Sequence, residues 1–144
     1  MKTVFFYGTE VALLGLAKQV RTKVFHEEQG IDQTLDFDGN DEMAFHVLAF
    51  MDGTPIGTVR MIAFGEHGRV GRLCVLKEFR SKGTGSQLME EIENGARKEG
   101  ILTLELHSQL HVADFYLKLG YEKDGPIFEE AGISHVNMKK NLAT

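Results

Sequence analysis

The 144-residue chain contains one cysteine, Cys74, and only two prolines. One cysteine allows no disulfide within the chain, so we expect a reducing, cytoplasmic setting. No apolar run approaches the ~18 residues that a membrane-spanning helix needs, so we expect no membrane partner. The opening MKTVFFYGTE has a short apolar stretch that ends at Gly8. That stretch is too short for a signal peptide and predicts a first strand.

The chain also lacks an excess of positive charge, with 16 Lys and Arg against 21 Asp and Glu. A general nucleic-acid binder needs a basic face, so we expect no nucleic-acid partner. Acidic residues gather between positions 32 and 42 in a stretch that is either a solvated loop or part of an electrostatic funnel for a cationic acceptor. They are Asp32, Asp36, Asp38, Asp41 and Glu42. The length fits a single domain, residues 1–144.

Metal-binding patterns are missing as well, since the sequence has neither H-E-x-x-H nor paired cysteines. His107 and His111 are four residues apart, but a strand-to-helix boundary is expected between them. We therefore predict no metal site. Cys74 lies among aliphatic residues, where a cysteine is usually inert core rather than a nucleophile.

Hydrophobic periodicity predicts alternating helices and strands. Apolar residues between Glu10 and Phe25 recur at helical spacing, with Thr9 as the expected N-cap. Three strands follow, over about 43–51, 54–64 and 69–76, and then a helix that ends at Gly100, a strand near 102–107, a short helix that ends at Gly120, and two final strands within 121–130 and 133–141. This order predicts an α/β (α+β) fold, a mixed sheet flanked by helices, with one right-handed parallel βαβ unit.

The stretch FRSKGTGSQL, residues 79–88, joins the third of these strands to the following helix. Backbone N–H groups at a helix start have no helical acceptor, and glycines let an anion approach them closely. The P-loop pattern is excluded because no Lys-Ser/Thr follows the second glycine, and the dinucleotide pattern because position 88 is Leu. Taken alone, the turn leaves both an anion site and a plain connection open.

The wider sequence around this turn resembles the GNAT superfamily of N-acetyltransferases. In RLCVLKEFRSKGTGSQLMEEIENGARKEG, the residues Arg80, Gly83 and Gly85 fill that superfamily's motif A, [R/Q]-x-x-G-x-[G/A]. Downstream, LELHSQLHVADFYLKLGYE resembles its motif B, with Phe115, Tyr116, Gly120 and Tyr121 in the signature positions. VFHEEQGID and EEAGISHVNMKK are similar to a small bacterial branch of single-domain members.

The resemblance implies an acyl-CoA N-acyltransferase fold, whose sheet is splayed between its fourth and fifth strands to hold acetyl-CoA. It implies a pyrophosphate loop of Arg80, Ser81, Lys82, Gly83, Thr84, Gly85 and Ser86. It also implies pantetheine contacts at Leu73, Cys74 and Val75, one of whose N–H groups would polarise the thioester carbonyl. Gln109 falls where many relatives carry an asparagine that contacts the cofactor arm, so this contact stays open.

The implied activity is transfer of an acetyl group to a primary amine of a small molecule or protein. Tyr116 matches the superfamily's usual general acid, and Glu105 and Glu28 are candidate bases. Candidate acceptor-binding residues are Gln29, His46, His107, His111 and His135. A non-catalytic CoA-binding sensor of the same fold is the alternative, and a homodimer is frequent among members of the superfamily.

Overall fold

The structure, a computed structural model, describes residues 1–143. Its strands are β1 (Lys2–Tyr7), β2 (Phe45–Met51), β3 (Thr54–Phe64), β4 (His67–Val75), β5 (Thr103–Gln109), β6 (Glu122–Lys123), β7 (Phe128–Glu130) and β8 (Ile133–Asn141). Its α-helices are α1 (Val11–Arg21), α2 (Gln33–Asp36), α3 (Thr84–Lys98) and α4 (Ala113–Lys118). Further short turns are the π-helix η1 (Thr22–Glu28) and the 3₁₀ turns η2 (Asp41–Met43), η3 (Lys77–Phe79) and η4 (Leu110–Val112).

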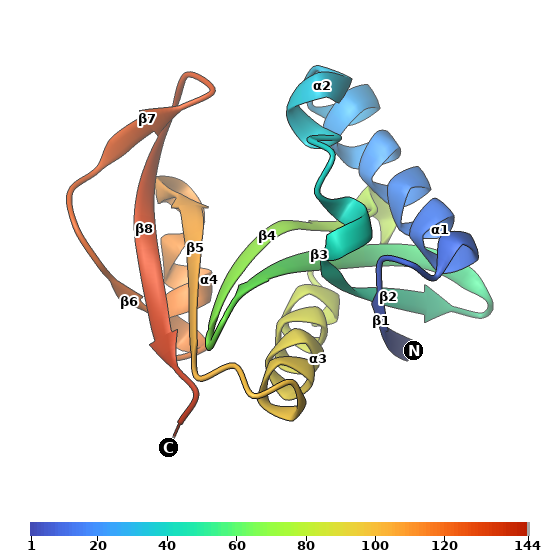
Figure 1. Ribbon diagram of the computed structural model, residues 1–144. Helices are drawn as coiled ribbons and strands as arrows, with labels where there is room; N and C mark the ends of the chain where they lie inside the picture. Colours follow the sequence, from blue (N-terminus) through green and yellow to red (C-terminus); the bar gives the residue numbers. More distant parts are fainter. Residues whose placement is uncertain (144) are drawn as a thin grey trace.

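The strands form one mixed sheet in the order β1-β2-β3-β4-β5-β8-β6, with β7 paired to β8. Within residues 1–143 only β4 and β5 are parallel neighbours, and α3 connects them. Helices α1 and α3 lie on opposite faces of the β1–β4 part of the sheet, and α4 lies beside β5 (Figure 1). The predicted fold class, a mixed sheet flanked by helices, is confirmed.

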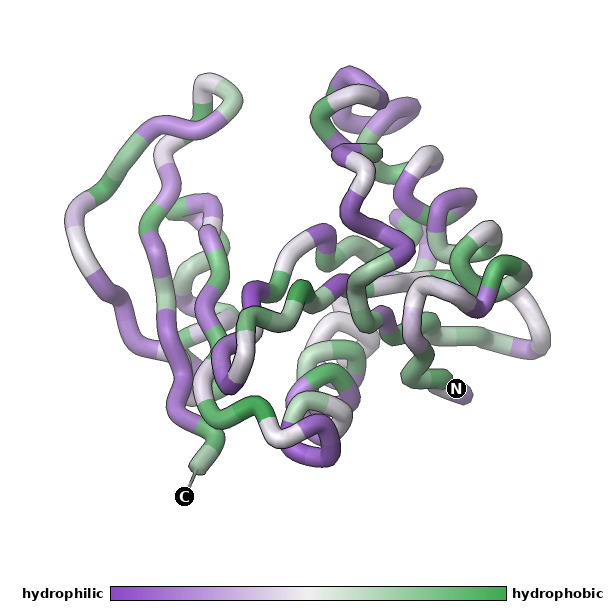
Figure 2. The backbone as a smooth tube through the Cα atoms, viewed as in Figure 1, coloured by the Kyte–Doolittle hydropathy of each residue, from purple (hydrophilic) through white to green (hydrophobic). Residues whose placement is uncertain are grey.

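The core forms where the central strands meet α1 and α3. Hydrophobic residues recur along β3, β4 and one side of α3 in Figure 2, whereas hydrophilic residues recur along β8. The fully buried core side chains include Ala17, Val47, Leu48, Val59, Met61, Leu88, Met89 and Ile92. None of the helices within residues 1–143 is long and apolar enough to cross a membrane.

Strands β4 and β5 part along their length. They pair only from His67 opposite Thr103 to Val70 opposite Leu106. Just beyond, Gly71 lies opposite Arg60 and Cys74 opposite Thr58, so two residues of β4 face one of β3. This β-bulge includes Arg72, whose φ is +59°. Because a bulge bends its strand, β4 turns away from β5 there, and the predicted splay is confirmed.

The first helix differs from the prediction. Glu10, not Thr9, occupies the N-cap, and its side chain makes no capping hydrogen bond. The α-helix ends at Arg21 and continues as the π-helix η1 to Glu28. A π-turn places more residues per turn than an α-helix, which rotates the following side chains relative to a continuous α-helix. Hydrophobic spacing alone could not separate the two forms.

The C-terminal region also differs, since three strands replace the two predicted. Gly125, with φ +100°, and Pro126 interrupt the stretch YEKDGPIFEE. Proline has no N–H to donate to a ladder, so the stretch divides into β6 and β7. Both strands pair with β8.

Candidate functional site

The N-terminus of α3 presents a run of free backbone donors. Gly83 is the N-cap, with φ +83° and no side-chain cap. The first hydrogen bond of the helix runs from Gln87 N–H to the Gly83 carbonyl at 3.0 Å. Within residues 1–143, the N–H groups of residues 81–86 have no acceptor. These donors, together with the partial positive charge of the helix end, suit an anion.

The glycines keep this helix end accessible. A Cβ on Gly83 would meet nothing within 4 Å, and a Cβ on Gly85 would lie 3.4 Å from the Phe115 ring. Only glycine adopts the positive φ of position 83 without strain. No acidic residue occupies the first turn of α3, and the Lys82 ammonium lies 5.9 Å from the Phe79 ring centroid. The loop therefore fits a pyrophosphate in both shape and charge.

Arg80 does not stand free beside this loop. Its guanidinium donates two hydrogen bonds to Glu28, of 2.7 and 2.6 Å, and its Nε donates to the Val75 carbonyl at 2.8 Å. The hydrogen bond from Arg80 lowers the pKa of Glu28. A carboxylate that is paired and acidified in this way is a poor general base, so the geometry argues against that role for Glu28.

The segment Leu73–Val75 follows Val70, the last residue of β4 that pairs with β5. The Val75 carbonyl accepts from Arg80 rather than from a neighbouring strand. Cys74 is 5% exposed, and burial raises the pKa of its thiol to about 12. The thiol therefore stays protonated at neutral pH, so Cys74 is a core residue and not a nucleophile.

Tyr116 lies on α4, half-buried, with its ring edge-to-face with those of Phe115 and Tyr121 at centroid distances of 5.0 and 5.9 Å. Burial raises the pKa of Tyr116 to about 12. Among the residues that the structure describes, no hydrogen-bond partner engages its hydroxyl. The hydroxyl is thus a neutral donor that is free to act on a bound group.

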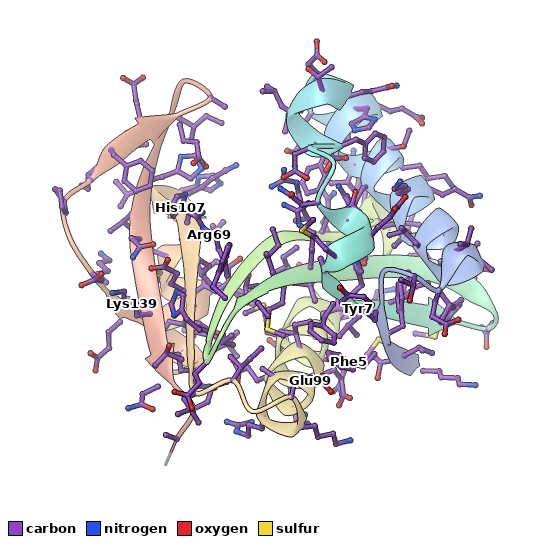
Figure 3. All side chains as sticks on the ribbon, in the orientation of Figure 1. Phe5, Tyr7, Arg69, Glu99, His107 and Lys139 are labelled. Carbon is purple, nitrogen blue, oxygen red and sulfur yellow. The ribbon has the colours of Figure 1, made fainter. Side chains whose placement is uncertain are left out.

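The face of β4, β5 and β8 on the side of α1 is polar. Side chains alternate between the two faces of a strand, and those on the opposite face are buried. They include Leu104, Leu106 and Met138. The register therefore places one polar set together: His67, Arg69, Glu105, His107, Asn137 and Lys139. Figure 3 shows Arg69, His107 and Lys139 on this face of β4, β5 and β8. Helices α1 and α2 cover only the β1–β4 part of the sheet (Figure 1).

Glu105 is tied to two neighbours on this polar face. Its carboxylate lies 3.2 Å from His67 Nε2 and accepts a 3.2 Å hydrogen bond from Asn137. Burial alone would raise the pKa of Glu105, but the hydrogen bonds from His67 and Asn137 outweigh burial and lower it. Its basicity falls accordingly, which argues against Glu105 as the general base.

His107 has a partner that sequence reasoning missed. Its Nδ1 lies 3.0 Å from Glu130 Oε1, and its ring stands edge-to-face with Phe128 at 5.0 Å. The other Glu130 oxygen lies 3.6 Å from His135 Nε2. Glu130 is 23 residues from His107, and only the pairing of β7 with β8 and of β8 with β5 brings them together. No local signal in the sequence marks this contact.

Four predicted site residues remain: His46, Gln29 and His111 for the acceptor, and Gln109 for the cofactor arm. His46 is 1% exposed, donates a hydrogen bond from Nε2 to the Asp41 carbonyl at 2.8 Å, and stacks on Phe6. A side chain this deeply buried cannot line an open acceptor site, so the placement of His46 there is corrected. Gln29 is exposed at the end of η1. Gln109 ends β5, and His111 is exposed on η4.

Of the two alternatives left open for the acidic stretch, the electrostatic funnel is not supported, because three of its carboxylates pair with arginines. Arg21 binds both Asp36 and Asp41, at 2.8 and 2.7 Å. Arg60 binds Asp38 at 2.8 Å. These pairs neutralise the carboxylates and fasten the segment around α2 to the sheet. In the chain from residue 1 to 143, no group of three His, Cys, Asp or Glu residues is placed to hold a metal ion.

Comparison with known proteins agrees with this geometry. The family model described as "Acetyltransferase (GNAT) domain" matches residues 12–142. The Bacillus subtilis protein named "Uncharacterized N-acetyltransferase YjcF" is 32% identical over 126 residues, which cover 85% of this chain and 88% of that protein.

Two solved structures extend the likeness in fold. Escherichia coli ElaA has a TM-score of 0.87 at 24% identity, over 96% of this chain and 98% of that one. An aminoglycoside 6'-N-acetyltransferase complexed with coenzyme A has a TM-score of 0.78 at 17% identity, over 99% and 97% of the two chains.

Proposed function

Because the chain belongs to the acetyltransferase (GNAT) family, we propose that it moves an acetyl group from acetyl-CoA directly to a primary amine. Acyl transfer is the chemistry of the family, whereas the donor and the acceptor are our proposal. The observation that carries it is the row of free N–H groups at residues 81–86, on the α3 N-terminus that follows the parted end of β4.

The CoA pyrophosphate binds these N–H groups. Hydrogen bonds to a charged acceptor contribute roughly 1.5–3 kcal/mol each, so three or four anchor it firmly. The ion pair of Arg80 with Glu28 and its bond to Val75 hold the loop in place. The pantetheine arm runs along Leu73–Val75, where a backbone N–H polarises the thioester carbonyl.

The amine must be neutral to attack. A lysine-like amine has a pKa near ~10.4, so its neutral form costs about 4.6 kcal/mol at pH 7. We assign the proton acceptor to His107. When its Nδ1–H donates to Glu130, its Nε2 is left as the proton acceptor. The paired carboxylates Glu28 and Glu105 are weaker candidates.

The departing thiolate needs a proton or a hydrogen bond. Tyr116 is the proposed general acid: burial raises its pKa to about 12, so its hydroxyl stays protonated and donates a hydrogen bond to the thiolate. Such a group keeps its proton throughout the pH range in which an amine acetyltransferase works. The proposed acid, Tyr116, then lies on α4 and the proposed base, His107, lies on β5. The 3₁₀ turn η4 joins these two elements.

Release of free CoA thiol tests the proposal. The protein is mixed with acetyl-CoA and a panel of primary amines that includes amino acids, polyamines and a lysine peptide. We expect at least one amine to raise the rate of thiol release well above hydrolysis, with an acetylated product of the expected mass. Thiol release that no amine stimulates, alongside normal acetyl-CoA binding, would contradict amine transfer.

A further inference from the structure

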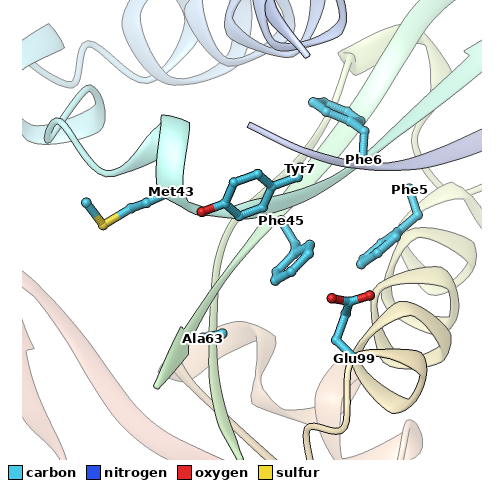
Figure 4. Close-up of a pocket in the computed structure, with 7 residues that line it drawn as sticks. All are labelled: Phe5, Phe6, Tyr7, Met43, Phe45, Ala63 and Glu99. Carbon is cyan, nitrogen blue, oxygen red and sulfur yellow. The ribbon is translucent and has the colours of Figure 1, made fainter. Parts of the chain in front are cut away.

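A second pocket lies away from the site described above. It has a volume of about 680 Å³ and opens where β1, the start of β2 and the end of β3 meet the C-terminal end of α3 (Figure 4). It is a shallow hollow that is wide open to solvent, not an enclosed cavity. Four aromatic rings, a methionine, an alanine and one carboxylate line it: Phe5, Phe6, Tyr7, Phe45, Met43, Ala63 and Glu99. None of them belongs to the loop 80–86 or to the polar face.

The aromatic rings are held in place by the packing of the fold. Phe5 and Phe45 stack at a centroid distance of 5.4 Å with planes 8° apart. Tyr7 stands edge-on to Phe45 at 5.0 Å. Phe5 also occupies the space beside Gly95 of α3, where any Cβ would overlap its ring. The pocket wall is therefore pre-formed, so little ordering is needed before a ligand binds.

Glu99 is the one charged residue in this lining, and its position is unfavourable. It is the C-cap of α3, where the carbonyl end of the helix carries partial negative charge and favours cations. Its side chain is exposed, and within residues 1–143 it has no ion-pair partner. A residue that breaks a local rule without a compensating contact points to a function. The carboxylate and the helix end both attract positive charge.

We propose that this pocket binds a small organic cation, with its charged group beside Glu99 and its alkyl groups against Phe5, Phe45 and Tyr7. An ammonium or quaternary ammonium ion with compact apolar substituents fits both halves of the lining. An anion is disfavoured by the carboxylate, and a neutral solute would leave that carboxylate unpaired. The proposal does not rest on acetyl transfer, because no residue of the pocket takes part in it.

The probe is choline, with 3,3-dimethylbutan-1-ol as its neutral isostere, titrated into the intact protein. The Met43 methyl and the amides of Phe45 and Glu99 are followed by NMR. We expect choline to cause saturable shifts at these residues and the neutral isostere to bind at least ~10-fold more weakly. Equal affinity for the two probes, no saturable shift, or shifts confined to His107 and its neighbours would overturn the proposal.

Two variants separate charge from folding. Glu99→Gln should weaken choline binding at least ~5-fold while the melting temperature holds or rises, because the repulsion at the helix end is removed. Glu90→Gln makes the same change on α3, outside the pocket, and should leave choline affinity unaltered. Tyr7→Leu, at a ring that is 40% exposed, should also weaken binding. Unchanged affinity in both Glu99→Gln and Tyr7→Leu would overturn the assignment.

Discussion

Tyr116 and Tyr121 are five residues apart, yet their hydroxyl groups have different surroundings. The Tyr121 hydroxyl donates a 2.8 Å hydrogen bond to Glu93, whereas no hydrogen bond within residues 1–143 engages the Tyr116 hydroxyl. We expect Tyr116→Phe to lower kcat by roughly 100-fold, since it removes the proton donor, with CoA affinity nearly unchanged. Steady-state kinetics and calorimetric CoA titration measure the two quantities.

Tyr121→Phe is the matched control for that prediction. It leaves Glu93 short of a donor, so it should reduce the free energy of unfolding by about 1–2 kcal/mol while kcat per folded molecule stays near wild type. A Tyr116→Phe enzyme with unchanged turnover would show that another group protonates the thiolate.

His107 and Glu130 are the second pair to test at this scale. His107→Ala should lower kcat/KM by ~100-fold or more, and added imidazole should restore part of it. Glu130→Gln should have a smaller effect of the same kind, because it loosens the ring at its Nδ1 contact of 3.0 Å. The control is Glu129→Gln, the exposed neighbour on β7, which should behave as wild type. Turnover that survives His107→Ala without imidazole would refute the base assignment.

At the scale of elements, a negative charge added at the α3 N-terminus should raise stability and weaken CoA binding. Ser86→Glu places a carboxylate in the first turn of the helix, where it should stabilise the protein by about 0.3–1 kcal/mol. The same charge repels a pyrophosphate, so affinity for CoA should fall by at least tenfold. Asn94→Asp adds a charge farther along α3 and should leave CoA affinity unchanged. Intact CoA binding in Ser86→Glu would place the phosphates elsewhere.

The ion pairs of the segment that contains α2 predict that the folded protein loses stability in acid. Hydrogen bonding to Arg60 lowers the pKa of Asp38, and for Asp41 the pairing with Arg21 and Arg60 outweighs burial and also lowers it. Both folded-state values lie below the unfolded value of ~3.9. Their stabilisation is therefore complete above about pH 5 and is lost as the pH falls through the folded-state values.

Urea unfolding between pH 3 and 6 measures this dependence. The wild type should lose stability below about pH 4, and Asp38→Asn should show a shallower decline because one of the two linked groups is gone. Identical pH profiles for the two proteins would contradict the linkage.

Elements that short-range patterns define were predictable from the sequence. The glycine turn before α3, the stop at Gly100 and the motif at Phe115–Tyr121 each depend on neighbouring residues, and the structure has α3 and α4 in those places. The sequence left the role of the acidic stretch open because the partners of Asp36 and Asp38, namely Arg21 and Arg60, lie 15 and 22 residues away. Glu130 was missed for the same reason, since strand register and not sequence spacing carries it to His107.

On the scale of the whole molecule, the sheet consists of a β1–β4 wing and a β5–β8 wing. The two wings pair with each other at one end only. Glu93 of α3 bonds Tyr121 and also Lys140 of β8, at 2.8 Å each. This network links the helix under the β1–β4 wing to the β5–β8 wing while β4 and β5 remain apart beyond Val70. The opening is therefore a fixed feature of the fold that is available to a ligand before it binds.

The melting temperature of the intact protein, titrated with acetyl-CoA, tests the account most directly. At ~100 times the dissociation constant, a ligand of the folded state adds about 2.7 kcal/mol, which is roughly 5–10 °C for a chain of this size. We predict a saturable rise of that order with acetyl-CoA and a much smaller one in Ser86→Glu. A melting temperature that millimolar acetyl-CoA leaves unchanged would contradict the assignment of residues 81–86 and the parted strands as its site.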